Sequence, residues 1–289
     1  MTVKKDLVLT SKAGRDFLLD AYFPDNAVAT PLVIFAHGFK GFKDWGCWHL
    51  IAEEFVIAGY AFVKFNFSHN GTTIDKPLDF ADLEAFGKNN YTKELQDLDA
   101  VLNWASDSSN WPNPKAIDLH KLALIGHSRG GGISIIKAAD DERIKALVTW
   151  ASVAQLDYSW HKKEDQISEW KREGVLRALN GRTKQMMPLY YQLNENIINN
   201  KDAYSTELAL QKRNNLPMLF LHGTADPAVP HSAAEQLKQW KPDASLILLE
   251  GANHVFRARH PWPEDAILES DSKELCERSI SFLENRFNT

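Results

Sequence analysis

The sequence predicts an α/β fold in which a mostly parallel, doubly wound sheet is flanked by helices. Two observations support this. Short apolar runs, too short for helices, alternate along the chain with longer segments whose apolar residues recur three and four positions apart. The chain of 289 residues, 44% of them hydrophobic, is also long enough to bury one large core. In such a sheet, functional residues are expected at the carboxyl ends of the strands.

The first half of the chain follows this alternation. Its central strands are continuous apolar runs, as expected where both faces of a strand are buried, and Gly59 ends the first amphipathic helix. In order, we expect two antiparallel strands within residues 7–23, a strand at 31–36, a helix at 48–56, a strand at 60–67, a helix at 91–105 and a strand at 122–125.

The alternation stops after a strand at residues 144–151. The next roughly 60 residues are longer than an ordinary connection, and we interpret residues 152–215 as a cap inserted between two parts of the core, 1–151 and 216–289. A solvated excursion explains the charged and amide-rich composition about equally well. Aromatic residues favour a lid over a binding cleft; they are Trp160, Trp170, Tyr190 and Tyr191.

The cap contains a hairpin signal. Residues 175–179 and 182–186 flank Asn180-Gly181, the dipeptide most typical of a two-residue type I′ turn. After the cap we expect a strand at 216–221, a helix at 233–240, a strand at 245–249 and a final helix through Leu275 and Leu283.

The clearest functional signal is the pattern Gly-x-Ser-x-Gly at residues 126–130, which is centred on Ser128. An apolar run precedes it and residues at helical spacing follow it, so the strand, sharp turn and helix that this motif requires are all present. Such a turn exposes the serine hydroxyl and leaves room only for glycine two residues to either side. We therefore predict that Ser128 is a nucleophile.

The partners that a serine nucleophile needs follow the carboxyl ends of two further predicted strands. Asp226 follows the strand at 216–221, and His254 follows the next strand. An imidazole can take the hydroxyl proton, while a carboxylate fixes the tautomer of the ring. The order Ser128, Asp226, His254 predicts a catalytic triad. Asp157 is the alternative acid, since it also lies just past a strand.

The segment that follows the predicted strand at 31–36 contributes to an oxyanion hole. The backbone N–H groups of Phe39 and Arg129 are the predicted donors, each worth about 10²- to 10³-fold in turnover. Because only their backbones are involved, their side chains are interpreted as incidental. His37 and His222 are expected to form hydrogen bonds within their loops. The ring of His127 is predicted to point away from the nucleophile, into the packing of the sheet.

Three tryptophans are candidates for substrate contact. Trp45 and Trp48 follow the His37 loop and could line an acyl pocket, although packing in the core or at its rim is equally compatible. Trp160 belongs to the cap. An aromatic cap favours a moderately bulky, uncharged acyl group.

Composition argues against several other classes. The formal charge of −5, without any block of lysine or arginine, suggests neither a nucleic acid nor a membrane surface as partner. We find no secretion signal and no apolar run approaching the roughly 20 residues of a membrane span. Cys47 and Cys276 lie far apart without metal-ligand spacing, which favours a reduced, cytoplasmic setting. Oligomeric state is left open.

The motifs together resemble the α/β-hydrolase superfamily, and within it the dienelactone-hydrolase-like, acyl-peptidase-like and cinnamoyl (feruloyl) esterases. The resemblance covers nearly the whole chain and rests on His37-Gly38-Phe39, residues 126–131, residues 222–226 with Val229-Pro230, and Asn253-His254. It implies an eight-stranded-type sheet, a Ser-Asp-His triad, an acyl-enzyme intermediate, and no metal or organic cofactor. The chain departs from dienelactone hydrolases proper, which resemble cysteine enzymes, and it matches only the catalytic part of the large oligopeptidases.

We therefore expect a cytoplasmic serine hydrolase that cleaves small-molecule carboxylic esters, with Ser128 attacking, His254 carrying the proton and Asp226 orienting the ring. Two alternatives remain at this point. One is an aminopeptidase-like amide hydrolase that uses the same triad, and the other is a non-catalytic binding protein of the same fold.

Overall fold

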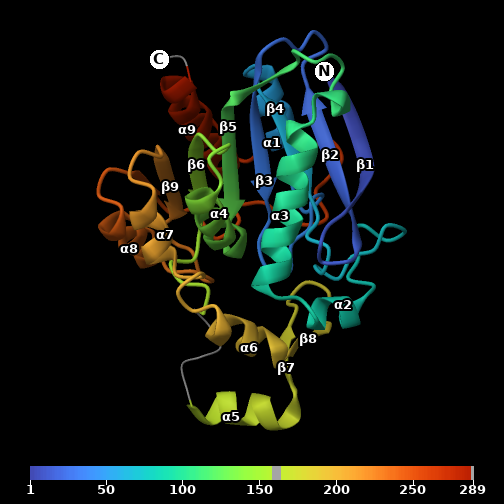
Figure 1. Ribbon diagram of the computed structural model, residues 1–289, viewed down its shortest axis with the longest axis vertical. Coiled ribbons are helices and arrows are strands. Elements are labelled where there is room, and N and C mark those ends of the chain that lie inside the picture. Colours follow the sequence, from blue (N-terminus) through green and yellow to red (C-terminus); the bar gives the residue numbers. More distant parts are fainter. Residues whose placement is uncertain (158–163, 288–289) are drawn as a thin grey trace.

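A computed structural model describes residues 1–157 and 164–287 of the chain (Figure 1). Within them, one eight-stranded sheet has the order β1-β2-β4-β3-β5-β6-β9-β10. The first two pairs, β1 with β2 and β2 with β4, are antiparallel, and the remaining pairs are parallel. The strands are β1 (Thr2–Thr10), β2 (Asp16–Phe23), β3 (Thr30–Ala36), β4 (Ala61–Phe65), β5 (Ile117–His127), β6 (Ala146–Trp150), β9 (Met218–Gly223) and β10 (Ser245–Leu249). The predicted α/β class is confirmed.

Helices cover both faces of this sheet. The helices are α1 (Trp48–Ile57), α2 (Leu83–Gly87), α3 (Tyr91–Ser106), α4 (Arg129–Asp140), α5 (Glu164–Glu173), α6 (Gln192–Asn199), α7 (Thr206–Lys212), α8 (Ser232–Trp240) and α9 (Ser270–Phe287). Along β3, Ile34 packs with α3 and α4 on one face, whereas Phe35 packs with α1 and α9 on the other. This alternation of side chains explains why the central strands read as unbroken apolar runs.

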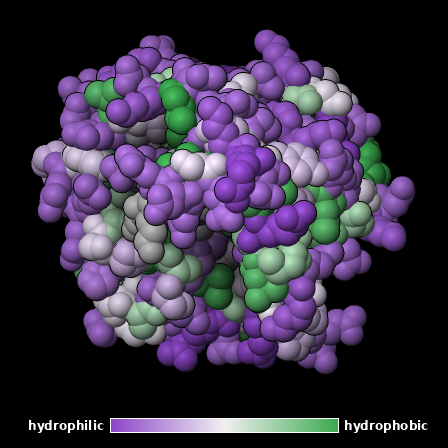
Figure 2. All heavy atoms as spheres, turned by 90° about the horizontal axis from the view of Figure 1, so that it is seen from below, coloured by the Kyte–Doolittle hydropathy of each residue, from purple (hydrophilic) through white to green (hydrophobic). Residues whose placement is uncertain are grey.

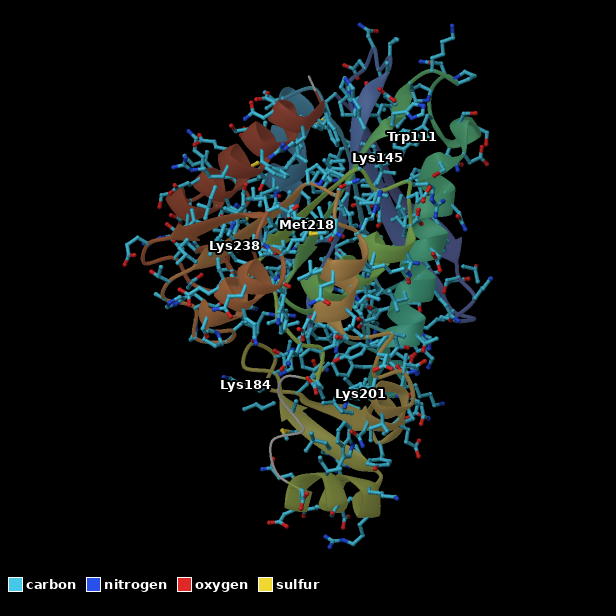
Figure 3. The ribbon with its side chains drawn as sticks, turned by 60° about the vertical axis from the view of Figure 1, so that its left-hand side comes forward. Trp111, Lys145, Lys184, Lys201, Met218 and Lys238 are labelled. Carbon is cyan, nitrogen blue, oxygen red and sulfur yellow. The ribbon has the colours of Figure 1, made fainter. Side chains whose placement is uncertain are left out.

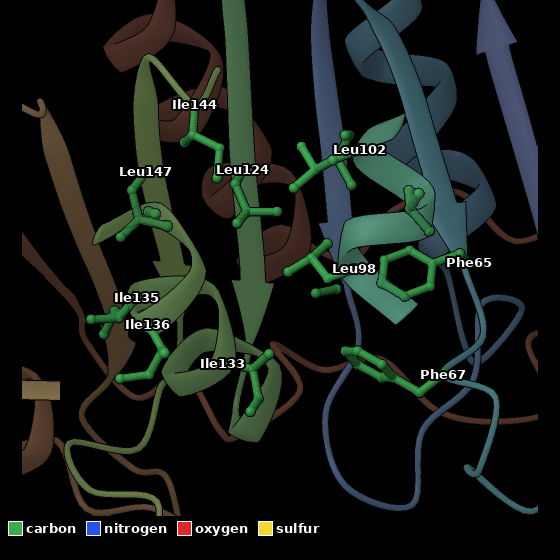
Figure 4. Packing of buried hydrophobic residues seen from close by; sticks show 14 of the residues in the cluster. Phe65, Phe67, Leu98, Leu102, Leu124, Ile133, Ile135, Ile136, Ile144 and Leu147 are labelled. Carbon is green, nitrogen blue, oxygen red and sulfur yellow. The ribbon is translucent and has the colours of Figure 1, made fainter. Parts of the chain in front are cut away.

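The core beneath α3 and α4 holds the first turns of these helices close to the end of β5. Leu98 of α3, Leu124 of β5 and Ile133 of α4 are fully buried and converge in this layer (Figure 4). A buried leucine or isoleucine side chain contributes about 1.5–3 kcal/mol. This packing therefore fixes the segment that immediately precedes and follows the predicted nucleophile.

The segment between β6 and β9 carries α5, a two-stranded sheet, α6 and α7. The part from α5 to α6 lies beyond the lower end of the main sheet in Figure 1, whereas α7 packs against α4 and α8. Lys184 and Lys201 belong to this segment, while Met218 lies in the main sheet (Figure 3). The segment is attached to the core at several points, including a hydrogen bond from Lys40 Nζ to the carbonyl oxygen of Leu179, 2.7 Å long. Its role as a cap stays a prediction.

The hairpin in this segment differs from the prediction. Its strands are β7 (Val175–Leu179) and β8 (Met186–Tyr190), so residues 180–185 form the connection in place of a two-residue type I′ turn. The side-chain oxygen of Asn180 accepts hydrogen bonds from the backbone N–H groups of Arg182 and Thr183. Within this connection Lys184 adopts the left-handed backbone conformation, with φ at 60°. The asparagine side chain thus stabilises a wider loop.

No helix in the described ranges combines the length and the apolar character needed to cross a bilayer.

Candidate active site

Ser128 lies at the sharp turn between β5 and α4. Its backbone has φ 56° and ψ −122°, a conformation that residues with a Cβ rarely adopt. Two hydrogen bonds maintain it: the N–H of Ser128 donates to the carbonyl oxygen of Trp150, and the N–H of Gly131 donates to the carbonyl oxygen of Ser128, both at 2.9 Å. The strain is therefore held by the surrounding strands and helix.

Close backbone approach explains the glycines of the motif. A Cβ on Gly126 would lie 2.4 Å from the carbonyl oxygen of Gly130, and a Cβ on Gly130 would lie 2.4 Å from that of Ala36. A Cβ on Gly38 would lie 2.8 Å from the Cβ of Ser128. The loop after β3 consequently presses its backbone against the serine, which only glycine permits.

Three strand ends bring the predicted triad together. The Nε2 atom of His254 lies 3.1 Å from Oγ of Ser128, and its Nδ1 atom lies 2.7 Å from Oδ2 of Asp226. Asp157 instead lines a cavity beside α7 and Trp240. The geometry favours Asp226 as the partner of His254.

The carboxylate of Asp226 is surrounded by donors. Its Oδ1 atom accepts the N–H groups of Ala228 and Val229 at 2.8 and 2.9 Å. Its Oδ2 atom lies 3.2 Å from Nε2 of His222 and 2.7 Å from Nδ1 of His254. Burial opposes ionisation and is the largest single influence, but the hydrogen bonds from His222 and His254 outweigh it and lower the pKa of Asp226 below its ordinary range. Asp226 is therefore an anion at neutral pH.

The two predicted oxyanion donors lie on segments adjacent to Ser128. Arg129 is the first residue of α4, where backbone N–H groups lack partners within the helix. Phe39 follows Gly38 in the loop that contacts Ser128. The side chains of these two residues also meet, because the guanidinium carbon of Arg129 lies 4.6 Å from the centroid of the Phe39 ring.

Comparison with known proteins decides the family. A model of the alpha/beta hydrolase family matches residues 33–264. The chain belongs to this family. Among curated relatives of this α/β hydrolase, the quorum-quenching protein AidA of Acinetobacter baumannii is 27% identical over 203 residues, covering 68% of this chain and 62% of AidA.

Other similar proteins extend the comparison. A putative carboxymethylenebutenolidase of Escherichia coli K12 is 24% identical over 191 residues, covering 63% of this chain and 53% of the relative. These matches span less than two thirds of the curated relatives. Est1E of Butyrivibrio proteoclasticus with bound ferulic acid has a TM-score of 0.70 at 20% identity, covering 98% and 100% of the two chains. The α/β hydrolase GrgF of Penicillium sp. sh18 has a TM-score of 0.75 at 15% identity, with complete coverage of both. At these identities the likeness shows the fold alone.

His127 is buried in this hydrolase, but its ring does not point away from the site. Its Nε2 atom lies 2.9 Å from the carbonyl oxygen of His254, and the two ring centroids are 4.9 Å apart. The predicted packing is confirmed, since the ring also lies 5.5 Å from that of Trp48 between centroids. The predicted orientation away from the site was wrong, because the residue that follows β10 as the candidate base, His254, packs against the same ring. Burial, followed by the charge on His254, lowers the pKa of His127 to about 3. The ring is thus a neutral donor that supports the loop bearing His254.

His37 makes the predicted loop hydrogen bonds. The N–H of Phe67 donates to Nε2 of His37 at 3.2 Å, so Nδ1 carries the proton and donates to the carbonyl oxygen of Gly38 at 2.9 Å. Burial lowers the pKa of His37 to about 4, which keeps it neutral. His222 bonds within its loop as expected, with Nε2 2.9 Å from the carbonyl oxygen of Val229. Its additional proximity to Asp226 was not predicted, although the spacing of four residues across a turn was a usable signal.

The tryptophan candidates separate into different environments. Trp48 is 3% exposed and packs against Phe35 and Trp150, which favours core packing over a place in the acyl pocket. Trp45 is half-buried and lies 5.9 Å from Trp48 between ring centroids, at the rim of that core. Trp160 lies outside the described residues.

Proposed function

We propose that this α/β hydrolase is a serine hydrolase that cleaves carboxylic esters through an acyl-enzyme intermediate. The observation that carries the proposal is the continuous chain of contacts from Ser128 Oγ to His254 at 3.1 Å and from His254 to Asp226 at 2.7 Å. Both lie within the range in which a base can take a proton from a nucleophile and a carboxylate can orient the base.

In the proposed reaction, Ser128 Oγ attacks the ester carbonyl carbon while Nε2 of His254 takes the hydroxyl proton. The carbonyl π electrons move to oxygen, where the N–H groups of Phe39 and Arg129 stabilise the negative charge. Collapse of this intermediate expels the alcohol, which takes the proton back from His254. Water then attacks the acyl group with the same base and releases the acid.

The electrostatics around the base suit this cycle. Asp226 remains ionised next to Nδ1 of His254, so it stabilises the imidazolium that forms in each half of the reaction. His37 and His127, whose pKa values burial lowers to about 4 and about 3, add no competing positive charge at neutral pH. His37 and His127 are thereby excluded as the groups that carry the proton.

The acyl group is proposed to be moderately bulky and uncharged. The face at the lower end of the molecule is mostly hydrophilic, with hydrophobic residues gathered around a hollow near its centre (Figure 2). One similar structure holds ferulic acid, an aromatic acid. Aryl esters are therefore the first substrates to test, alongside matched anilides, which separate ester from amide cleavage.

Labelling with a serine-directed fluorophosphonate tests the proposal. Wild-type protein is expected to be labelled on the peptide that contains Ser128, because the reagent requires an activated hydroxyl. Ser128→Ala should abolish labelling, and His254→Ala should slow it by about 10³-fold or more. Folded wild-type protein that hydrolyses esters without labelling at Ser128 contradicts the proposal, and so does undiminished labelling of Ser128→Ala.

A further inference from the structure

Arg129 and Glu94 form an ion pair inside the protein, beside the proposed nucleophile. The Nη2 atom of Arg129 lies 2.6 Å from Oε1 of Glu94, and their side chains are only 7% and 1% exposed. Arg129 is the first residue of α4, and Glu94 lies in the first turn of α3. The pair therefore ties the start of α3 to the start of α4, which directly follows Ser128.

The pair also contacts the loop after β3. The guanidinium carbon of Arg129 lies 4.6 Å from the centroid of the Phe39 ring, a distance typical of a cation–π contact. The ring centroid of Phe39 in turn lies 5.4 Å from that of Phe86 in α2. The Arg129 side chain thus joins the two backbone segments that supply the proposed oxyanion donors.

Stability alone does not account for this pair. Removing two charges from water costs several kcal/mol for each ion, and buried pairs often contribute nothing net. Glu94 is also incompletely satisfied: Oε1 accepts both Arg129 and Asn89, while Oε2 has no hydrogen-bond partner among the described residues. Burial consequently raises the pKa of Glu94 despite its contact with Arg129. An arrangement this costly is expected where it fixes a geometry.

We propose that Glu94 and the side chain of Arg129 are positioning residues for the oxyanion hole. Through the stack on Phe39 they hold the N–H groups of Phe39 and Arg129 at the distance and angle that the developing oxyanion requires. This inference rests on the proposed serine hydrolase function. It assigns a role to the side chain of Arg129, which the motif alone treats as replaceable, and to Glu94, which lies outside the motif.

The role predicts a specific kinetic effect. Loss of one oxyanion donor costs about 10²- to 10³-fold in turnover, and a displaced donor loses part of that. Removing the pair should therefore lower kcat by about 10- to 100-fold while KM stays within about twofold, because the donors act on the transition state.

Two matched ketones measure the oxyanion hole directly. With a phenylethyl trifluoromethyl ketone, Ser128 Oγ adds to the carbonyl carbon, the π pair moves to oxygen and His254 takes the hydroxyl proton, so the adduct carries an oxyanion. The matching phenylethyl methyl ketone binds without addition. The ratio of the two inhibition constants therefore reports stabilisation of the oxyanion, separately from binding of the phenylethyl group that both ketones share.

Three variants and one control complete the experiment. Glu94→Gln, Arg129→Met and the double variant are each expected to reduce the inhibition ratio by about 10-fold or more. Arg129→Met retains the backbone N–H. Asp99→Asn is the control, because Asp99 pairs with Lys137 between the same helices, α3 and α4, and its side chain is half-exposed. The inhibition ratio of this variant should stay within about twofold of wild type.

The double variant separates positioning from a merely structural role. If the single changes act only by leaving one buried charge unpaired, removal of both charges restores the ratio, and that result overturns the inference. Should either single variant fail to fold, Phe39→Leu, which removes the ring but keeps the ion pair, must also lower the ratio. A wild type that shows neither ester hydrolysis nor preference for the trifluoromethyl ketone refutes the proposed function instead.

Discussion

Asp226 shows how single residues around the site support one another. Its carboxylate accepts backbone N–H groups on one oxygen and faces His254 and His222 on the other. His222 is fully buried, and its Nδ1 atom has no partner among the described residues. The proton of His222 consequently lies on Nε2, which faces Oδ2 of Asp226. His222 thereby helps to hold the carboxylate of Asp226 in the orientation that His254 needs.

His222→Leu is expected to lower kcat by about 10-fold and the free energy of unfolding by about 1–3 kcal/mol, because a buried carboxylate loses a donor. The depressed pKa of Asp226 contributes stability above the ordinary value of 3.8, and this stability disappears on acidification. In His222→Leu the pKa of Asp226 moves back up, so the pH-dependent part of the stability becomes smaller. Acidification should therefore lower the free energy of unfolding less in the variant than in wild type, and the difference between the two proteins should shrink at acid pH.

Ester kinetics and denaturant unfolding at pH 7 and at acid pH measure these effects. His231→Gln, an exposed histidine change in the same stretch, is the control and should leave both unchanged. Wild-type kcat in His222→Leu would contradict the positioning of Asp226 by His222.

The three residues of the proposed triad could be selected from the sequence because each follows an apolar strand in a recognisable order. The sequence did not identify the Glu94–Arg129 pair or the contact between His222 and Asp226, since these depend on which side chains meet across turns and helices. Glu94 did leave a trace: it stands three residues after Tyr91 and four before Leu98, on the buried stripe of α3. A charge on an apolar stripe signals a buried partner.

At the scale of elements, the turn between β5 and α4 depends on space that only glycine leaves. Gly130→Ala places a Cβ 2.4 Å from two backbone carbonyl oxygens, those of Ala36 and His37, neither of which can move without shifting β3. We expect a loss of about 3 kcal/mol or more in the free energy of unfolding, together with loss of activity.

Gly181→Ala is the matched control for that change. No atom lies within 4 Å of the added Cβ, and Gly181 is not in the left-handed region. Denaturant unfolding should therefore show a change between zero and about 1 kcal/mol of added stability. A strongly destabilised Gly181→Ala would instead support the type I′ turn, in which this glycine needs positive φ.

Secondary structure was predicted correctly where a local run of apolar residues defines the element. It was predicted incorrectly where a side-chain hydrogen bond determines the backbone conformation. The strand at 245–249 has the expected bounds, because its apolar run is closed by a turn at Gly251. The hairpin loop is wider than expected because the Asn180 side chain bonds to following amides. The short helix α2 was not anticipated; its five residues are too few for a period to appear.

At the scale of the whole molecule, the alternation of strands and helices was sufficient to predict a doubly wound sheet. How residues 164–212 attach to that sheet was not predictable, because the attachment joins residues that are distant in sequence. Trp170, Leu189 and Leu210 are buried in the same hydrophobic cluster as the core, and polar contacts accompany them. The hydroxyl of Tyr190 donates a hydrogen bond to Glu84 in α2, and Nζ of Lys40, in the loop after β3, donates one to the carbonyl oxygen of Leu179. The contact of Lys40 connects the segment proposed as a cap to the loop that carries Phe39.

The central claim is that Ser128 becomes acylated with His254 as its base. Rapid mixing with a nitrophenyl ester of a bulky acid, followed by acid quench and peptide mass spectrometry, tests it most directly. We predict a burst of nitrophenolate and an acyl group on the peptide containing Ser128, with neither detected in Ser128→Ala. Hydrolysis at the wild-type rate by Ser128→Ala, or an acyl group on another residue, would contradict it.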